Sequence, residues 1–97
     1  MLVGTLTIQI NLHGIGSLKD KRKIVKSLIG RLQSRFNFSV SEIAANESKL
    51  MAVIGIALVS NDGVFIQKQF DKAINFARKD GRFYMGNTKQ EIFSTEC

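Results

Sequence analysis

Apolar and polar residues alternate along the start of the chain, and this pattern predicts a strand over residues 2–12. Leu2, Leu6, Ile8, Ile10 and Leu12 fall on one face of this strand. The opposite face is richer in threonine and amide side chains. A period of two with many β-branched residues is typical of a strand with one buried face and one wetter face. Gly14 and Gly16 then end the strand.

A helix is predicted over residues 17–36, because apolar side chains recur there at the spacing of one helical face. These side chains are Leu18, Val25, Leu28, Ile29, Leu32 and Phe36. Ser17 is a favourable N-cap residue, and Asp20 supplies a carboxylate in the first turn. The sequence therefore predicts an amphipathic helix whose apolar side covers a sheet.

The second half of the chain predicts three further strands and a second helix. Residues 38–43 have the pattern of a short strand, and the continuous apolar stretch 50–59 indicates a central strand buried on both faces. A helix is expected to begin at the capping residues 60–62 and to end at Gly81. The remaining stretch, residues 82–93, predicts a weaker strand that a bulge interrupts at Gly86-Asn87.

The predicted order of elements, β-α-β-β-α-β, is that of the ferredoxin-like split βαβ arrangement. We therefore expect an α+β fold in which two helices cover one face of an antiparallel four-stranded sheet. A chain of 97 residues has room for one such domain, residues 1–97. One cysteine cannot form an internal disulfide, and no stretch is long enough to span a bilayer. We expect a cytoplasmic protein with no membrane association and no metal or cofactor.

Positive charge is concentrated in the predicted helix 17–36. The chain has a net charge of +6, and this helix holds seven basic residues and one acidic residue. The seven are Lys19, Lys21, Arg22, Lys23, Lys26, Arg31 and Arg35. Helical spacing places Lys19, Arg22, Lys23 and Lys26 on one outward face, and Arg31 and Arg35 on another flank.

A helix whose surface charges are nearly all positive is typical of proteins that bind a polyanion. A solvated face that only keeps the protein soluble is the alternative, and the sequence leaves both open. A helix lying on a membrane surface is disfavoured, because the apolar side of this helix is needed to cover the sheet.

The loop between the first strand and the first helix offers a second candidate site, with Gly14, Gly16 and Ser17 as a possible anion loop. Its spacing is not that of a P-loop, and glycines that only turn the chain are the alternative. Acylphosphatases share the expected topology, but their loop carries a phenylalanine and an arginine that are absent here. A small phosphate-handling enzyme is therefore the least favoured hypothesis, and we assign no catalytic residue and no small-molecule substrate.

The predicted third strand is apolar on both faces, although the helices can cover only one. Either the alternate residues from Leu50 to Leu58 or those from Met51 to Val59 face the open side. An apolar strip at the centre of a sheet is typical of a partner surface, so we expect a homodimer through this face, with shielding by long neighbouring side chains as the alternative. This strand has no aromatic residue, so base stacking like that of the RNA-recognition motif is not expected.

Three segments of the chain resemble the YlxP-like family, bacterial proteins grouped under a domain of unknown function. They are SLKDKRKIVKSL at 17–28, RFNFSVSEI at 35–43 and VSND at 59–62. The resemblance covers most of the chain, weakens after Gly81, and implies a ferredoxin-like fold in a bacterial cytosolic protein. It implies no activity. Members are often encoded beside translation and ribosome-maturation genes, which suggests RNA or a ribosomal particle as the partner of the basic helix.

Overall fold

The computed structural model describes residues 1–96, and Cys97 lies outside the described part. The elements are β1 (Leu2–Asn11), α1 (Leu18–Arg35), β2 (Ser39–Ala44), β3 (Met51–Ser60), α2 (Gly63–Arg78) and β4 (Tyr84–Ser94). The predicted order and the α+β class are confirmed. Most boundaries lie within two residues of the prediction, but α2 ends three residues before Gly81.

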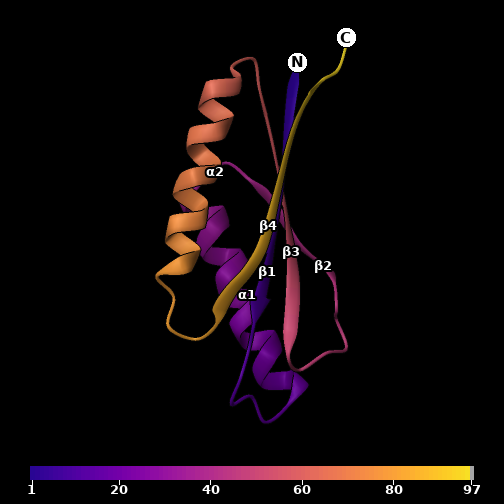
Figure 1. Ribbon diagram of the computed structural model, residues 1–97, viewed down its shortest axis with the longest axis vertical. Coiled ribbons are helices and arrows are strands. Elements are labelled where there is room, and N and C mark those ends of the chain that lie inside the picture. Colours follow the sequence, from indigo (N-terminus) through magenta and orange to yellow (C-terminus); the bar gives the residue numbers. More distant parts are fainter. Residues whose placement is uncertain (97) are drawn as a thin grey trace.

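The four strands form one antiparallel sheet in the order β2-β3-β1-β4. Both helices lie on the same face of this sheet, and Figure 1 shows that they are offset along the long axis of the molecule. α2 covers the end of the sheet that carries both chain termini, and α1 covers the opposite end (Figure 1). The two helices overlap only near the middle, where the C-terminal parts of both lie side by side.

The core lies between the helices and one face of the two central strands. The strand residues that point into it are at most 5 % exposed and comprise Leu6, Ile8, Ile10, Ala52, Ile54, Ile56 and Leu58. The helices bury Val25, Leu28 and Leu32 of α1 and Ile66, Phe70, Ala73 and Ala77 of α2 against them. Each fully buried large aliphatic side chain contributes about 1.5–3 kcal/mol. The alternate β3 residues from Met51 to Val59 face the open side, where none of them is fully buried, so the predicted burial of this strand on both faces is wrong.

Both helices begin at the capping residues that the sequence indicates. The Ser17 side chain accepts a hydrogen bond of 3.1 Å from the backbone N–H of Asp20. The Asp62 carboxylate accepts from the backbone N–H groups of Val64 and Phe65. These bonds satisfy backbone donors that a helix start otherwise leaves unpaired.

Two irregularities interrupt the strand pairing. Ile8 pairs with Thr88 and Ile10 with Met85, so two residues of β4, at positions 86 and 87, oppose Gln9 of β1. This confirms the bulge that the sequence indicates at Gly86-Asn87. A second bulge, at Ile43 of β2, was not predicted.

The tightest approach between a helix and the sheet is at Gly4 of β1. A Cβ at this position would overlap the Cγ2 atom of Ile66 and lie 2.9 Å from the Cε2 atom of Phe70. Both α2 side chains are fully buried, so neither can move into solvent to make room. The absence of a side chain at Gly4 therefore sets how closely α2 packs on the sheet.

Replacing Gly4 by alanine should lower the free energy of unfolding by about 1–3 kcal/mol, because the added methyl group overpacks a dense core. Gly30→Ala is the matched control: Gly30 is exposed in the interior of α1, and no atom lies within 4 Å of a Cβ there. This control should raise the free energy of unfolding by about 1 kcal/mol. Guanidinium unfolding measures both, and a Gly4→Ala variant as stable as the wild type would contradict the close packing.

Candidate nucleic-acid interface

The two helices together form a strongly positive layer, which we call the helix layer and define as residues 17–36 and 63–82. The first segment carries seven basic and one acidic side chain and the second carries five basic and two acidic, so the helix layer has a net charge of +9. The rest of the chain carries two basic and five acidic side chains, a net charge of −3. The net positive charge of the helix layer is therefore larger than that of α1 alone, because α2 lies on the same face of the sheet as α1 (Figure 1).

Four of the predicted residues form a stripe along α1, and we call Lys19, Arg22, Lys23 and Lys26 the basic stripe. All four are exposed. Across residues 1–96 none of them takes part in an ion pair. The inner side of the helix is marked by Val25 and Leu28, which are buried against the sheet. The stripe therefore points away from the sheet, where phosphate groups could reach it.

Lys21 lies on the inner side of α1 and is not part of the accessible surface. Its side chain is 1 % exposed, and its Nζ atom lies 3.1 Å from Oε2 of Glu42 in β2. The same ammonium donates a hydrogen bond of 2.6 Å to the carbonyl oxygen of Ala45. Ala45 has a φ of 62°, in the left-handed region that a residue with a Cβ disfavours. Lys21 thus holds a strained turn in place. The prediction that Lys21 belongs to the nucleic-acid-binding surface is wrong, because its side chain is buried.

The position of Lys21 could have been recognised from its spacing. It precedes Val25 by four residues and Leu28 by seven, so it belongs to the apolar face of the helix. The identity of its partner could not have been recognised in this way, because Glu42 lies on a strand 21 residues further along the chain.

Arg31 and Arg35 lie on the flank of α1 that faces α2. The guanidinium carbon of Arg31 is 5.6 Å, and that of Arg35 is 4.8 Å, from the centre of the Phe76 ring of α2. Such cation–π contacts contribute about 0.5–1 kcal/mol each at exposed sites. They hold both arginines against the second helix, which their position in the sequence does not indicate.

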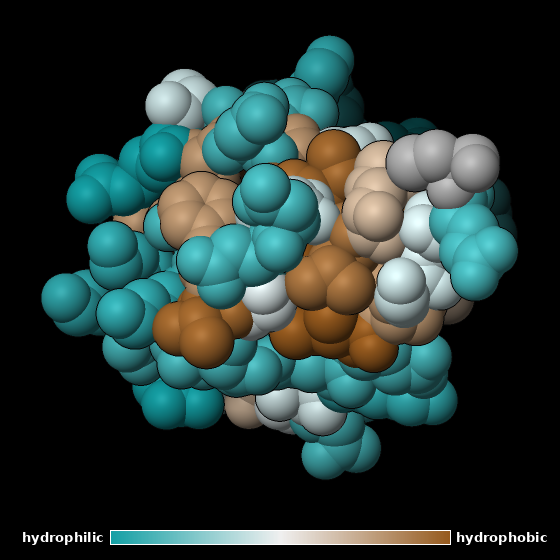
Figure 2. All heavy atoms as spheres, turned by 90° about the horizontal axis from the view of Figure 1, so that it is seen from above, coloured by the Kyte–Doolittle hydropathy of each residue, from teal (hydrophilic) through white to brown (hydrophobic). Residues whose placement is uncertain are grey.

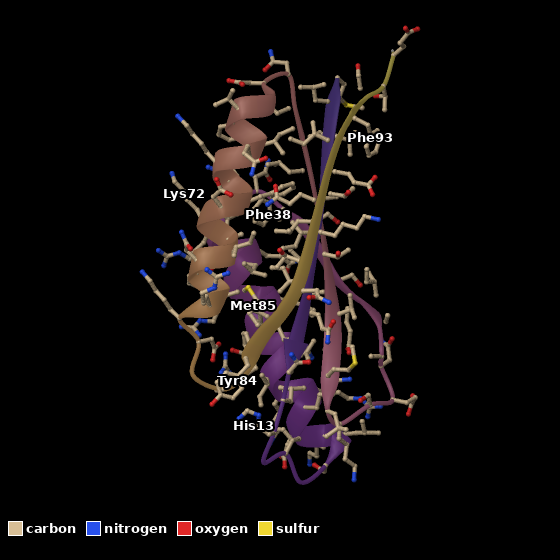
Figure 3. All side chains as sticks on the ribbon, in the orientation of Figure 1. His13, Phe38, Lys72, Tyr84, Met85 and Phe93 are labelled. Carbon is tan, nitrogen blue, oxygen red and sulfur yellow. The ribbon has the colours of Figure 1, made fainter. Side chains whose placement is uncertain are left out.

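The two arginines line an open groove of about 870 Å³ between the helices, which we call the helix groove. Its opposite wall belongs to α2 and the turn after it and includes Gln69, Lys72, Asn75, Phe76, Lys79 and Asp80. Lys72 projects from the outer side of α2 in Figure 3. Lys72 and Lys79 could not be singled out from the sequence, because outside the first helix the basic and acidic residues are equal in number.

Asp80 is the one acidic residue among the described lining residues of the helix groove, and Arg82 neutralises it. Arg82 donates hydrogen bonds of 2.9 and 2.6 Å to the two carboxylate oxygens of Asp80, and Arg31 lies 3.6 Å from one of them. The hydrogen bonds from Arg82 hold the pKa of Asp80 below its usual value, and Asp80 raises the pKa of Arg82. Positive charges therefore outnumber negative charges among the described lining residues of the helix groove.

The candidate anion loop has the geometry of a helix start. Gly14 adopts a φ of 73°, and the Ser17 hydroxyl is occupied as the N-cap of α1. A carboxylate oxygen of Asp20 lies 3.9 Å from where a Cβ of Gly16 would be. This negative charge disfavours a second anion, so the loop contributes less to an anion site than the helix layer does.

Next to this loop, the rings of His13 and Tyr84 pack against each other at a tilt of 30°, with their centres 4.5 Å apart (Figure 3). Among residues 1–96, no group of three or more His, Cys, Asp and Glu side chains gathers where it could hold a metal ion. Neither helix combines the length and apolarity that a membrane span requires.

The open sheet face is apolar mainly at the end that carries the chain termini. Pairing places Val59 of β3, Val3 of β1 and Phe93 of β4 in one row, and Val59 and Phe93 are 58 % and 46 % exposed. Figure 2, which looks onto this end of the molecule, shows apolar side chains gathered there.

The middle of the same face is polar or shielded. Thr5 and Thr7 of β1 pair with Glu91 and Lys89 of β4, whose charged groups lie 3.2 Å apart. Ile43 of β2 lies across Gly55, with its Cγ2 atom 2.7 Å from where a Cβ of that glycine would be. A neighbouring side chain thus covers part of the apolar strip.

Comparison with known proteins agrees with the resemblance found in the sequence. The DUF503 family, described as a protein of unknown function, matches residues 3–90. The "Uncharacterized protein YlxP" of Bacillus subtilis (strain 168) is 32% identical over 75 residues, which are 77% of this chain and 82% of that protein.

Two solved structures share the arrangement of the elements at low sequence identity. The de novo designed protein Foldit4 has a TM-score of 0.53 and 11% identity, with 98% of both chains covered. SnoaB, a cofactor-independent oxygenase from Streptomyces nogalater, has a TM-score of 0.53 and 8% identity, with 98% of this chain and 94% of that chain covered. The structural similarity shows a common fold, and at identities this low it carries no information about activity.

Replacing Lys21 by methionine should lower the free energy of unfolding by about 3 kcal/mol, because the Glu42 carboxylate would stay largely buried without its cation. Replacing Glu42 by leucine in the same chain should recover part of this loss, since neither charge would remain. Lys23→Met, at an exposed position of the same helix, is the control and should change the stability little. Equal unfolding midpoints for the Lys21 and Lys23 variants would contradict the buried ion pair.

Proposed function

The chain belongs to the DUF503 family of proteins of unknown function, and we propose that it is a cytoplasmic RNA-binding protein that contacts phosphates through its helix layer without catalysing a reaction. The observation that carries this proposal is the net charge of +9 on the helix layer, beside −3 on the rest of the chain. Ribosomal RNA, alone or in a ribosomal particle, is the first partner to test.

The geometry of α1 supports contact with a phosphate backbone. The basic stripe extends from Lys19 to Lys26, which is about 10 Å along a helix at its usual rise per residue. Its side chains are exposed and free of ion pairs within residues 1–96, so binding a phosphate breaks no existing pair. Each phosphate that a lysine or arginine neutralises releases counterions, and this release drives the binding.

The distribution of charge also orients the protein on RNA. On the open sheet face, Lys89 and Glu91 of β4 pair with each other, and β1 and β3 carry no charged side chain. An RNA molecule is therefore attracted to the helix layer and not to the sheet. Phosphate contacts of this kind position a protein on nucleic acid but read little sequence.

Replacing all four residues of the basic stripe by glutamine should weaken binding to ribosomal RNA and reduce its salt dependence. The slope of log K against log salt should become shallower by about 3, since four phosphate contacts are lost. Filter binding over a salt series measures this slope for the wild type and the variant.

The matched control is the double variant Lys49→Glu and Lys89→Glu, which changes the net charge by the same amount outside the helix layer. This control should retain the wild-type slope. Equal losses in the two variants would mean that only net charge matters, and absence of wild-type binding near physiological salt would refute RNA binding altogether. Circular dichroism spectra confirm that each variant is folded.

We propose as a second function that the open sheet face forms a homodimer, because Val59, Val3 and Phe93 lie in one row across three neighbouring strands. A stable dimer buries about 1,200–2,000 Å² in total, so the contact would extend beyond this row onto the rest of the face. The helix layer would remain free, and dimerisation is thus compatible with RNA binding.

Replacing Phe93 by glutamate should convert the protein to a monomer, because a charge would be buried at the apolar end of the contact. Phe65→Glu is the matched control, since Phe65 is equally exposed but belongs to α2, on the opposite side of the sheet. Sedimentation velocity over a concentration series measures both variants. A wild type that sediments as a monomer at the highest concentration would rule out the dimer.

A further inference from the structure

The helix groove differs from the basic stripe because it presents cations from two facing walls. Arg31 and Arg35 come from α1, and Lys72 and Lys79 come from α2. The stripe lies on a convex helix, which any phosphate-bearing surface can approach. A groove between two helices instead admits a narrow chain that can lie along it.

The arginines of the groove are held in place before any ligand arrives. Both pack over Phe76, yet the Arg31 side chain remains 57 % exposed and Arg35 is exposed as well. They are one helical turn apart, about 6 Å along the axis. A planar guanidinium can bind a phosphate through its edge and stack on a base through its face. Fixing these side chains in advance lowers the entropic cost of binding.

The α2 wall supplies complementary groups along the same groove. Lys72 and Lys79 are separated by seven residues, about 10 Å along the helix, which is enough to serve more than one phosphate. The amide side chains of Gln69 and Asn75 lie beside them and can donate to and accept from the edges of a base. Asp80 is held through both of its oxygens by Arg82 and lies 3.6 Å from Arg31, and within residues 1–96 it pairs with neither lysine.

We infer that the helix groove binds single-stranded RNA, with successive phosphates held between the arginines of α1 and the lysines of α2 and a base stacked on the arginine–Phe76 cluster. This inference rests on the proposed RNA-binding function and specifies which form of RNA the groove accepts. An RNA duplex turns its bases inward, so they cannot reach the cluster. Unpaired bases can, and stacking contributes about 1–3 kcal/mol per base.

The test uses fluorescence anisotropy with labelled oligouridylate of about twelve nucleotides, a length within the range that single-strand binding sites cover. An RNA duplex of equal length is the competitor. The wild type should bind the single strand more tightly than the duplex at physiological salt. The variant Lys72→Gln, Lys79→Gln should bind the single strand about tenfold more weakly, because two phosphate contacts are lost. Both lysines are exposed and, within residues 1–96, take part in no ion pair, so the fold should be retained.

A second variant separates stacking from charge. Phe76→Leu keeps an apolar side chain beside the arginines and removes the aromatic ring without changing the net charge. It should weaken binding of the single strand by about tenfold through loss of stacking. The slope of log K against log salt should be unchanged, since no cation is removed.

The matched control for charge is Lys49→Gln, Lys89→Gln, which lies outside the helix layer and should bind the single strand as the wild type does. Equal affinity of the wild type for duplex and single strand, or equal losses in the groove and control variants, would overturn the inference. Loss of ribosomal-RNA binding in the basic-stripe variant, together with unchanged binding in both groove variants, would also overturn it while leaving the proposed function intact.

Discussion

Burial of one face of β1 and β3 under the two helices is the constraint on which the rest of the structure depends. The strand residues that point toward the helices are at most 5 % exposed, and each helix turns a single apolar side toward them. A basic side chain on either helix must then point outward, point along a flank, or find a buried partner. The three kinds of basic residue on α1 follow from this: the basic stripe, the two arginines of the helix groove, and Lys21.

The segregation of charge into two layers is a consequence of the same packing. Because both helices lie on one face of the sheet, their polar sides form one surface with a net charge of +9, whereas the rest of the chain carries a net charge of −3. Within this surface, the exposed basic stripe on a convex helix suits general attraction to phosphates. The arginines packed on Phe76 in a concave groove suit recognition of one strand. In the RNA-binding function that we propose, the two regions would therefore serve different parts of a single interaction.

Two internal contacts determine where the helices sit. Gly4 allows α2 to pack directly on β1, and Lys21 ties α1 to Glu42 of β2 and to the turn at Ala45. Gly4 lies near the end of the sheet that carries the chain termini, and the turn at Ala45 lies at the opposite end. The helices are therefore offset along the sheet and overlap only at their C-terminal parts (Figure 1). That overlap is where the helix groove forms.

The sequence by itself determined the order of the elements, the caps at Ser17 and Asp62 and the bulge in β4, because each depends on neighbouring residues or on a short period. It also placed the basic stripe, since helical spacing alone defines one face. Only the tertiary structure decided that Lys21 is buried against Glu42 and that Lys72 and Lys79 face the two arginines across a groove. These contacts join residues at least 21 positions apart, and their geometry depends on how the helices pack on the sheet, which no local pattern specifies.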